Sequence, residues 1–296
     1  MQWIALDGKT AYLADSTNIG VYDLGDGRCI LIDSGYSSGH AEEIRQLLQE
    51  LGLRVAGIII THAHSDHCGG NHYFQEQENC RILASPRVAI MLNHPILMSE
   101  VIYSAAPPRV LTNRYLLPNS SRVTDELPIG MNEIEGATFE ILDLNGHSSG
   151  QIGVRTPDNI IFTGDALITP AELNTHRSIV IYNLEIHQRT LQQLAEQSAQ
   201  LFIPSHGEPF SSAEPVVQAN QEFIDGVLSL IEQYCVEGRS REQVVSHVIE
   251  CYGMAMSSSQ YYTLLSTISA LLTGLIHQRR IKMRYRNGNI EFSAVR

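Results

Sequence analysis

The sequence predicts an α/β protein that ends in a small helical domain. A stretch at residues 40–51 that is closed by Gly52 indicates a helix with a glycine at its C-terminal end. The apolar run that follows at residues 55–60 is rich in β-branched side chains, which is typical of a buried strand. In the last third of the chain, apolar residues repeat instead at helical spacing. We therefore expect an α/β domain over residues 1–211 and a helical domain over residues 212–296.

Short strands are expected before the first helix, because brief apolar runs alternate there with turn-forming residues. Gly25 and Gly27, on either side of Asp26, indicate the turn between the last two of these runs. The strands are expected at residues 3–6, 11–14, 19–22 and 29–32.

Residues 85–129 differ from the rest of the first domain, because prolines are interleaved there with methionines and other apolar residues. Such a segment predicts short helices and loops. One interpretation is an inserted lid or wall over a substrate cleft. The other is a surface elaboration or a dimer contact, and the sequence does not separate the two.

Three helices followed by a hairpin are expected in the last part of the chain. Ser211 and Glu214 resemble a capping box at the start of the first helix. Asn287 and Gly288 form a strong two-residue hairpin signal between two stretches of alternating residues. The second and third helices are expected to start at Ser240 and Ser258. This order resembles a winged-helix module.

A cluster of potential metal ligands directly follows the apolar run at residues 55–60. It comprises His62, His64, Asp66 and His67. Side chains alternate between faces in an extended chain, so His62 and His64 can point the same way. Twelve histidines allow some chance clustering, but burying this set without a cation would be costly. The spacing predicts a metal site, and it suits two neighbouring ions better than one.

This HxHxDH motif after a hydrophobic strand resembles the metallo-β-lactamase superfamily, whose members form an αββα sandwich. Three further segments match the family in the expected order. His147 lies in a Gly-His-Ser-Ser-Gly loop, Asp165 ends an apolar strand, and His206 lies in a Pro-Ser-His-Gly segment. Asp33 matches a position that braces the metal loop in the family. The resemblance covers residues from about 10 to 210.

The resemblance implies a centre of two divalent metal ions. The first site would be formed by His62, His64 and His147, and the second by Asp66, His67 and His206. Asp165, with its two carboxylate oxygens, would bridge both sites. No cysteine belongs to this set, so zinc is favoured, with iron or manganese as alternatives. Cys68 follows the motif directly, and we interpret it as a packing residue.

The function implied by this resemblance is hydrolysis by a metal-bridging hydroxide, with a small ester or thioester as the favoured substrate. Asp66 would relay a proton to the leaving group. True zinc β-lactamases tend to replace the bridging aspartate, whereas Asp165 retains the carboxylate. The chain therefore resembles the glyoxalase II, lactonase and nuclease branches more closely. A lactonase stays open as an alternative, and a diiron oxidoreductase is a less favoured one.

A ribonuclease or phosphodiesterase is a further alternative, because some family members with a C-terminal winged helix cleave RNA. A basic cluster in the expected hairpin would then contact nucleic acid. It comprises Arg279, Arg280, Lys282, Arg284 and Arg286. The simpler interpretation is a solvated hairpin face, which strand alternation alone explains.

Composition favours a globular protein that acts on a small molecule. Of the 296 residues 43% are hydrophobic and 18% charged, and the net charge of −12 argues against a nucleic-acid-binding surface over the whole molecule. Five scattered cysteines indicate a reducing compartment. The first residues do not resemble a signal peptide, and no run approaches the roughly 20 apolar residues of a membrane helix. We expect a cytoplasmic protein; a homodimer stays open.

Overall fold

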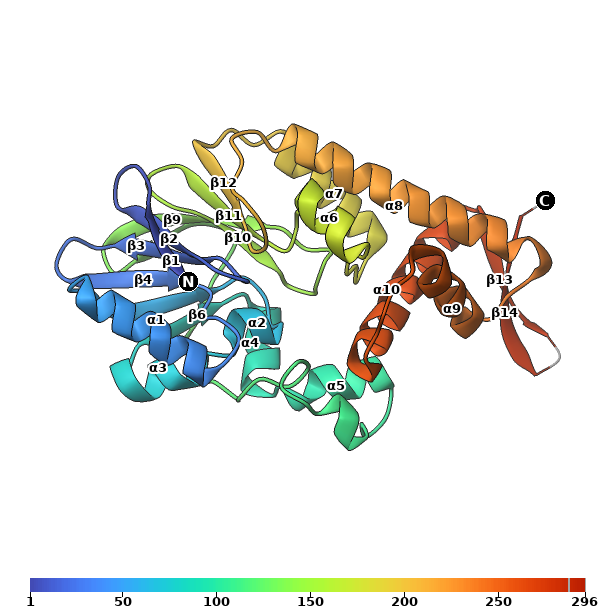
Figure 1. The fold of residues 1–296 in the computed structure, drawn as a ribbon, viewed down its shortest axis with the longest axis horizontal. Helices are drawn as coiled ribbons and strands as arrows, with labels where there is room; N and C mark the ends of the chain where they lie inside the picture. Colours follow the sequence, from blue (N-terminus) through green and yellow to red (C-terminus); the bar gives the residue numbers. More distant parts are fainter. Residues whose placement is uncertain (287, 296) are drawn as a thin grey trace.

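Two β-sheets packed face to face form the core of the N-terminal part of the computed structural model, which describes residues 1–286 and 288–295 (Figure 1). The first sheet has the strand order β1-β2-β3-β4-β5-β6-β7, antiparallel as far as β4 and parallel from β4 to β7. Its strands are β1 (Gln2–Ala5), β2 (Thr10–Ala14), β3 (Ile19–Asp23), β4 (Arg28–Ile32), β5 (Arg54–Ile60), β6 (Arg81–Ala84) and β7 (Asp125–Glu126).

The second sheet has the order β12-β11-β10-β9-β8, in which only β11 and β12 run parallel. Its strands are β8 (Gly130–Ile134), β9 (Ala137–Asp143), β10 (Ile152–Arg155), β11 (Ile160–Gly164) and β12 (Leu201–Pro204). The helices up to this point in the chain are α1 (Ser38–Glu50), α2 (Ser65–Cys68), α3 (Asn71–Glu78), α4 (Pro86–Asn93), α5 (Ile96–Tyr103), α6 (Pro170–His176) and α7 (Leu184–Ala195).

Strand alternation explains why the sheets are covered by helices on their outer faces. In β5, Ile59 belongs to the core between the sheets, whereas Ile58 and Ile60 pack with α1, α3 and α4. In β11, Phe162 faces the first sheet, whereas Ile161 packs with α7 and the C-terminal helices. Strands buried on both faces must be apolar throughout, which accounts for the continuous run at residues 55–60. The predicted αββα sandwich is confirmed.

Three helices and a hairpin follow the sandwich, in the order that the sequence predicts. They are α8 (Glu214–Tyr234), α9 (Arg241–Tyr252), α10 (Ser258–His277), β13 (Ile281–Arg286) and β14 (Asn289–Ala294). Among the described helices, none combines the length and apolar character needed to cross a membrane. The winged-helix assignment stays a prediction, and Asn287, half of the expected hairpin turn, lies outside the described residues.

Of the N-terminal caps expected for α9 and α8, the first is present and the second is not. The Ser240 hydroxyl accepts from the Gln243 backbone N–H in a reciprocal capping box, as predicted. Ser211 does not cap α8, because Ala213 at the N-cap is already helical (φ −75°, ψ −28°) and no side chain bonds the first turn. The acidic Glu214 and a proline in that turn make the start favourable without a serine cap.

The C-terminal helices share one hydrophobic cluster with the outer face of the second sheet. Ile161 and Phe202 from the sheet belong to it together with Ile224 of α8 and Ile268 of α10. Helices α7 and α10 approach closely at Gly274, where a Cβ atom would lie 2.3 Å from the Leu184 side chain. The division of the chain at residue 211 stays a prediction, but no solvent layer separates the two parts at this cluster.

We expect Gly274→Val to weaken this packing, because the added atoms would overlap Leu184. Overpacking of this kind costs about 1–3 kcal/mol. Gly226→Ala on α8 is the matched control, since its Cβ would meet only the Tyr252 hydroxyl, at 3.9 Å. Its free energy of unfolding should rise by about 0.5–1 kcal/mol because alanine favours a helix. Urea unfolding followed by circular dichroism measures both, and an unchanged midpoint for Gly274→Val would contradict the close approach.

Candidate metal centre

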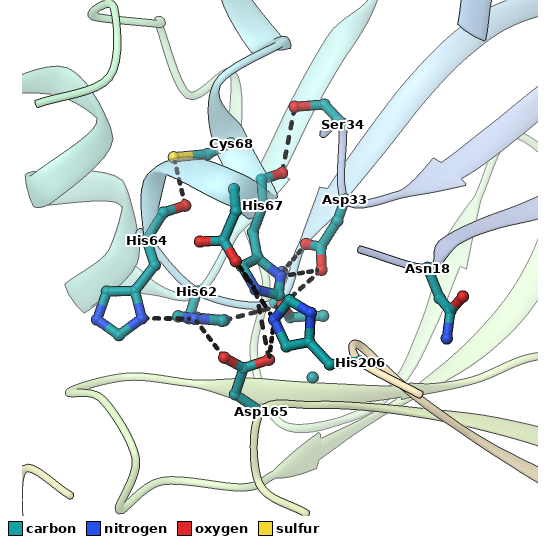
Figure 2. A network of polar contacts seen from close by, with 12 residues as sticks. Asn18, Asp33, Ser34, His62, His64, His67, Cys68, Asp165 and His206 are labelled. Carbon is teal, nitrogen blue, oxygen red and sulfur yellow. Dashed lines mark hydrogen bonds and ion pairs between the residues drawn. The ribbon is translucent and has the colours of Figure 1, made fainter. Parts of the chain in front are cut away.

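Five loops at one end of the sandwich bring the predicted ligands together (Figure 2). Asp33 follows β4, the histidine motif follows β5 and enters α2, and His147 lies in the loop between β9 and β10. Asp165 follows β11, and His206 follows β12. The strands on either side of the inter-sheet core end close together, which is why residues far apart in the sequence meet here.

The first cluster contains three imidazoles and one carboxylate oxygen. The Nδ1 atom of His64 lies 2.9 Å from Nε2 of His62 and 3.0 Å from Nε2 of His147. The Asp165 Oδ2 atom lies 3.8 Å from His62 Nε2 and 3.5 Å from His147 Nε2. Burial lowers the pKa of His62 and His64, and it lowers that of His147 to about 3. These imidazoles are therefore neutral at pH 7, the form that binds a metal ion.

The second cluster contains two imidazoles and the Asp66 carboxylate. Asp66 Oδ2 lies 3.4 Å from His67 Nε2 and 3.3 Å from His206 Nε2. Burial opposes a charge on His67 and His206, yet the neighbouring carboxylates outweigh it and raise the pKa of both, that of His206 to about 9. The Asp66 pKa lies well below its usual value, because His67 and His206 outweigh the opposing effect of burial. The electrostatic potential in this cluster is therefore negative because of the carboxylates, and it favours binding of a cation.

Asp165 lies between the two clusters. Its Oδ2 atom faces the first cluster, and its Oδ1 atom lies 3.4 Å from His67 Nε2 and 3.8 Å from His206 Nε2 in the second. Each oxygen is thus directed at a different set of imidazoles. This is the arrangement that a bridging ligand requires.

Three buried atoms of the ligand side chains have no hydrogen-bond partner among the described residues, namely His67 Nε2, His147 Nδ1 and Asp165 Oδ1. A buried polar atom without a partner costs about 1–3 kcal/mol, so native structures seldom retain one without a reason. Nitrogen and oxygen donors from the two clusters fit divalent ions such as zinc, iron or manganese. The residues present therefore fit the metal ions that the sequence implies.

Asp33 lies behind the motif loop and does not belong to either ligand cluster. It accepts hydrogen bonds from the Thr61 N–H and hydroxyl, each at 2.8 Å, and from His67 Nδ1 at 2.7 Å. The last bond places the proton of His67 on Nδ1 and leaves Nε2 directed at Asp66 and Asp165. Such contacts behind a metal ligand fix its tautomer and orientation.

The His206 loop is held by residues that sequence analysis missed. His206 Nδ1 donates to the Ser16 carbonyl at 2.6 Å, which directs Nε2 at the clusters. The buried Asn18 amide donates to the carbonyls of Pro204 and Gly207, both at 2.9 Å. Nothing in the local pattern around Asn18 marks it, because its partners lie almost two hundred positions away in the chain.

The His147 loop packs against the start of α7. Gly146 has a φ of +128°, and a Cβ atom there would lie 2.3 Å from the Cα of His187. The Gly146 carbonyl accepts from the backbone N–H groups of Tyr182 and Asn183, at 2.8 and 3.1 Å. Only glycine fits this position, which fixes the loop immediately before His147.

Cys68 is completely enclosed, and burial raises the pKa of its thiol. Its Sγ atom donates to the His64 carbonyl at 3.1 Å, and the side chain belongs to the core beneath α1 and α3. The thiol is neutral and points into the core, which agrees with the packing role that we expect for Cys68.

A cavity of about 1010 Å³ opens beside both clusters. His64, Asp66 and His147 lie in its wall, and so do residues of the 85–129 segment and of the loop between α9 and α10. This placement supports the interpretation of that segment as a wall of the cleft. The basic cluster does not reach the cavity: none of Arg279, Arg280, Lys282, Arg284 and Arg286, all within the described residues, lines it.

The sequence profile of the metallo-beta-lactamase superfamily matches residues 13–206. The chain belongs to this superfamily. A metallo-beta-lactamase family protein of Thermus thermophilus has the same fold over its length, with a TM-score of 0.76 and 16% identity over 99% of this chain and 97% of that one.

Two curated relatives of this chain are named as enzymes. The hydroxyacylglutathione hydrolase GloC of Haemophilus influenzae is 28% identical over 142 residues, which are 46% of this chain and 60% of that protein. An atrochrysone carboxyl ACP thioesterase of Pseudocercospora fijiensis is 22% identical over 286 residues, 94% of this chain and 74% of that protein. The chain thus spans about three fifths of the first relative's length and about three quarters of the second's.

We expect Asp33→Ala to weaken metal binding by about 10- to 100-fold, because His67 would lose the contact that orients its ring. The matched control is Cys68→Ala, which changes a neighbouring buried residue whose thiol donates to the His64 carbonyl and which is not among the proposed ligands. Competition with a chromogenic chelator during zinc titration measures both affinities. Equal affinities for Asp33→Ala and the unaltered protein would show that the brace has no part in metal binding.

Proposed function

We propose that this protein is a dinuclear metal-dependent hydrolase that cleaves a thioester or an ester. The observation that carries the proposal is the position of Asp165, with one oxygen directed at each cluster. The proposed ligands are His62, His64 and His147 for one ion, Asp66, His67 and His206 for the other, and Asp165 for both. Zinc is the metal that we favour for this donor set.

Two bound divalent ions would activate water and polarise the scissile carbonyl group. The chain's own residues have distinct tasks around them. His67 and His206 each have their Nδ1 proton held by an acceptor, so that Nε2 stays free to bind. Asp66 is about two-fifths exposed and lines the cavity, so its carboxylate can take a proton and pass it to the leaving group.

A thioester is the favoured substrate class for two reasons. The names of the two curated relatives, a hydroxyacylglutathione hydrolase and an ACP thioesterase, both support it. The bridging residue is also an aspartate rather than the cysteine or serine that true zinc β-lactamases tend to carry. A lactone would be cleaved by the same chemistry, so lactonase activity belongs in the same screen.

The RNA alternative finds less support in the position of the basic residues. The Arg280 guanidinium forms an ion pair with Glu232 at 2.6 Å, so its charge is already matched. Arg284 and Arg286 lie exposed on β13, outside the cavity wall. Both faces of β13 are exposed from Met283 to Arg286, so an open, solvated hairpin accounts for these arginines without an RNA ligand.

We expect Asp165→Ala to retain less than two metal ions per chain and to lose at least about a hundredfold in kcat/KM for thioester hydrolysis. The reason is that both clusters would lose a shared oxygen ligand. Asp225→Ala on the exposed face of α8 is the control and should leave both quantities unchanged. Elemental analysis and hydrolysis of an acetyl thioester are the measurements; full metal content and full activity in Asp165→Ala would refute the bridging role.

A parallel screen separates the substrate classes. The zinc-loaded protein should hydrolyse thioesters faster than lactones, phosphodiesters or single-stranded RNA, and an excess of chelator should abolish the activity. Charge reversal at Arg284 and Arg286 should leave thioester hydrolysis unchanged. RNA cleavage that this reversal suppresses would instead favour the nuclease alternative.

A further inference from the structure

Part of the wall of the cavity beside the metal centre is apolar, and the proposed chemistry does not use it. Its residues come from α5, from the segment that follows it, and from the loop before α10. They are Met98, Ile102, Leu116, Met254 and Met256, which we name the methionine compartment. These side chains line the same cavity as His64, Asp66 and His147. A group attached to the reacting carbon can therefore extend from the clusters into this compartment.

The compartment is a built structure, because both of its walls are fastened. The Tyr103 and Tyr262 rings pack edge to face at 5.6 Å between centroids, which joins the wall of α5 to α10. Asn113 Nδ2 donates to the Ser259 hydroxyl at 2.8 Å across the same boundary. The Ser65 hydroxyl donates to the Tyr115 carbonyl at 2.7 Å, which ties the segment to the metal loop.

The chemistry of the compartment favours a flexible apolar occupant. None of its five side chains can form a salt bridge, and none offers a strong hydrogen bond. Methionine side chains are unbranched and polarisable, so they adapt to ligands of different shape. The whole cavity, at about 1010 Å³, lies at the upper end of the roughly 300–1,000 Å³ of small-molecule sites. A two-carbon acyl group would leave most of it unfilled.

We propose that the methionine compartment binds the acyl chain of the substrate and that this chain is long and apolar. The substrates are then thioesters or esters of such acyl groups, rather than the small ester or thioester that the sequence suggests. The reaction in this statement rests on the proposed function, but binding of the chain does not. A long-chain carboxylic acid, the product of such a reaction, should bind even to the metal-free protein.

The expected dependence on chain length is steep. Each methylene that leaves water for an apolar site contributes about 0.8 kcal/mol, which corresponds to about a fourfold gain in kcat/KM. The value of kcat/KM should therefore rise from acetyl through hexanoyl to decanoyl thioesters of one thiol. It should level off when the compartment is filled.

The test introduces bulk on each wall of the compartment, with Met256→Trp before α10 and Met98→Trp on α5. Either variant should lower kcat/KM for the decanoyl thioester at least tenfold and change that for the acetyl thioester less than twofold. Met283→Trp is the matched control, because Met283 is 56% exposed on β13 and lies outside the cavity wall. The two walls are altered separately, so misfolding of one variant leaves the other as a test.

A binding measurement separates this inference from the proposed reaction. Isothermal titration calorimetry of the metal-stripped protein should detect decanoate but not acetate, and Met98→Trp and Met256→Trp should weaken the decanoate signal. If the zinc-loaded protein hydrolyses no ester or thioester but decanoate binds as described, acyl-chain binding by the compartment is supported and the proposed reaction is refuted. If thioesters are hydrolysed without a gain from acetyl to decanoyl, or the compartment variants match Met283→Trp, the inference is overturned and the reaction stands.

Discussion

Burial of carboxylates and imidazoles at one end of the sandwich is the constraint on which the rest of this structure depends. Asp165 and His67 lie almost completely enclosed with atoms that no hydrogen bond satisfies within the described residues. Such a cluster is costly to bury unless a cation completes it. The polar loops are held in place because the core between the two sheets fixes the strand ends that carry them.

Hydrogen bonds and packing contacts to the proposed ligands fix their orientation. His67 and His206 are both oriented by acceptors on Nδ1, one a carboxylate and the other a backbone carbonyl. Gly146 places the His147 loop directly on the backbone of α7. Since the proposed ligands come from the ends of β5, β11 and β12 and from the loop after β9, the geometry of the site depends on the packing of the whole sandwich.

Most of the cavity wall comes from parts of the chain outside the histidine motif. The 85–129 segment supplies one wall, and the loop between α9 and α10 supplies another. The C-terminal helices share their hydrophobic cluster with the second sheet, so this second wall is anchored in the same core as the metal loops. The proposed ligands and these two walls therefore lie on different segments of the chain.

The sequence by itself predicted several helices and strands and a candidate ligand set, because the patterns behind these predictions are short. The run at residues 55–60 and the capping box at Ser240 are patterns within a few residues, and the ligand motifs are equally short. The expected cap at Ser211 failed because the chain had already entered the helix at Ala213. Only the tertiary structure placed Asn18 behind His206 and set Met98 beside Met256 in one cavity. These contacts join segments far apart in the chain. The type of a residue alone does not indicate which distant residues it will contact.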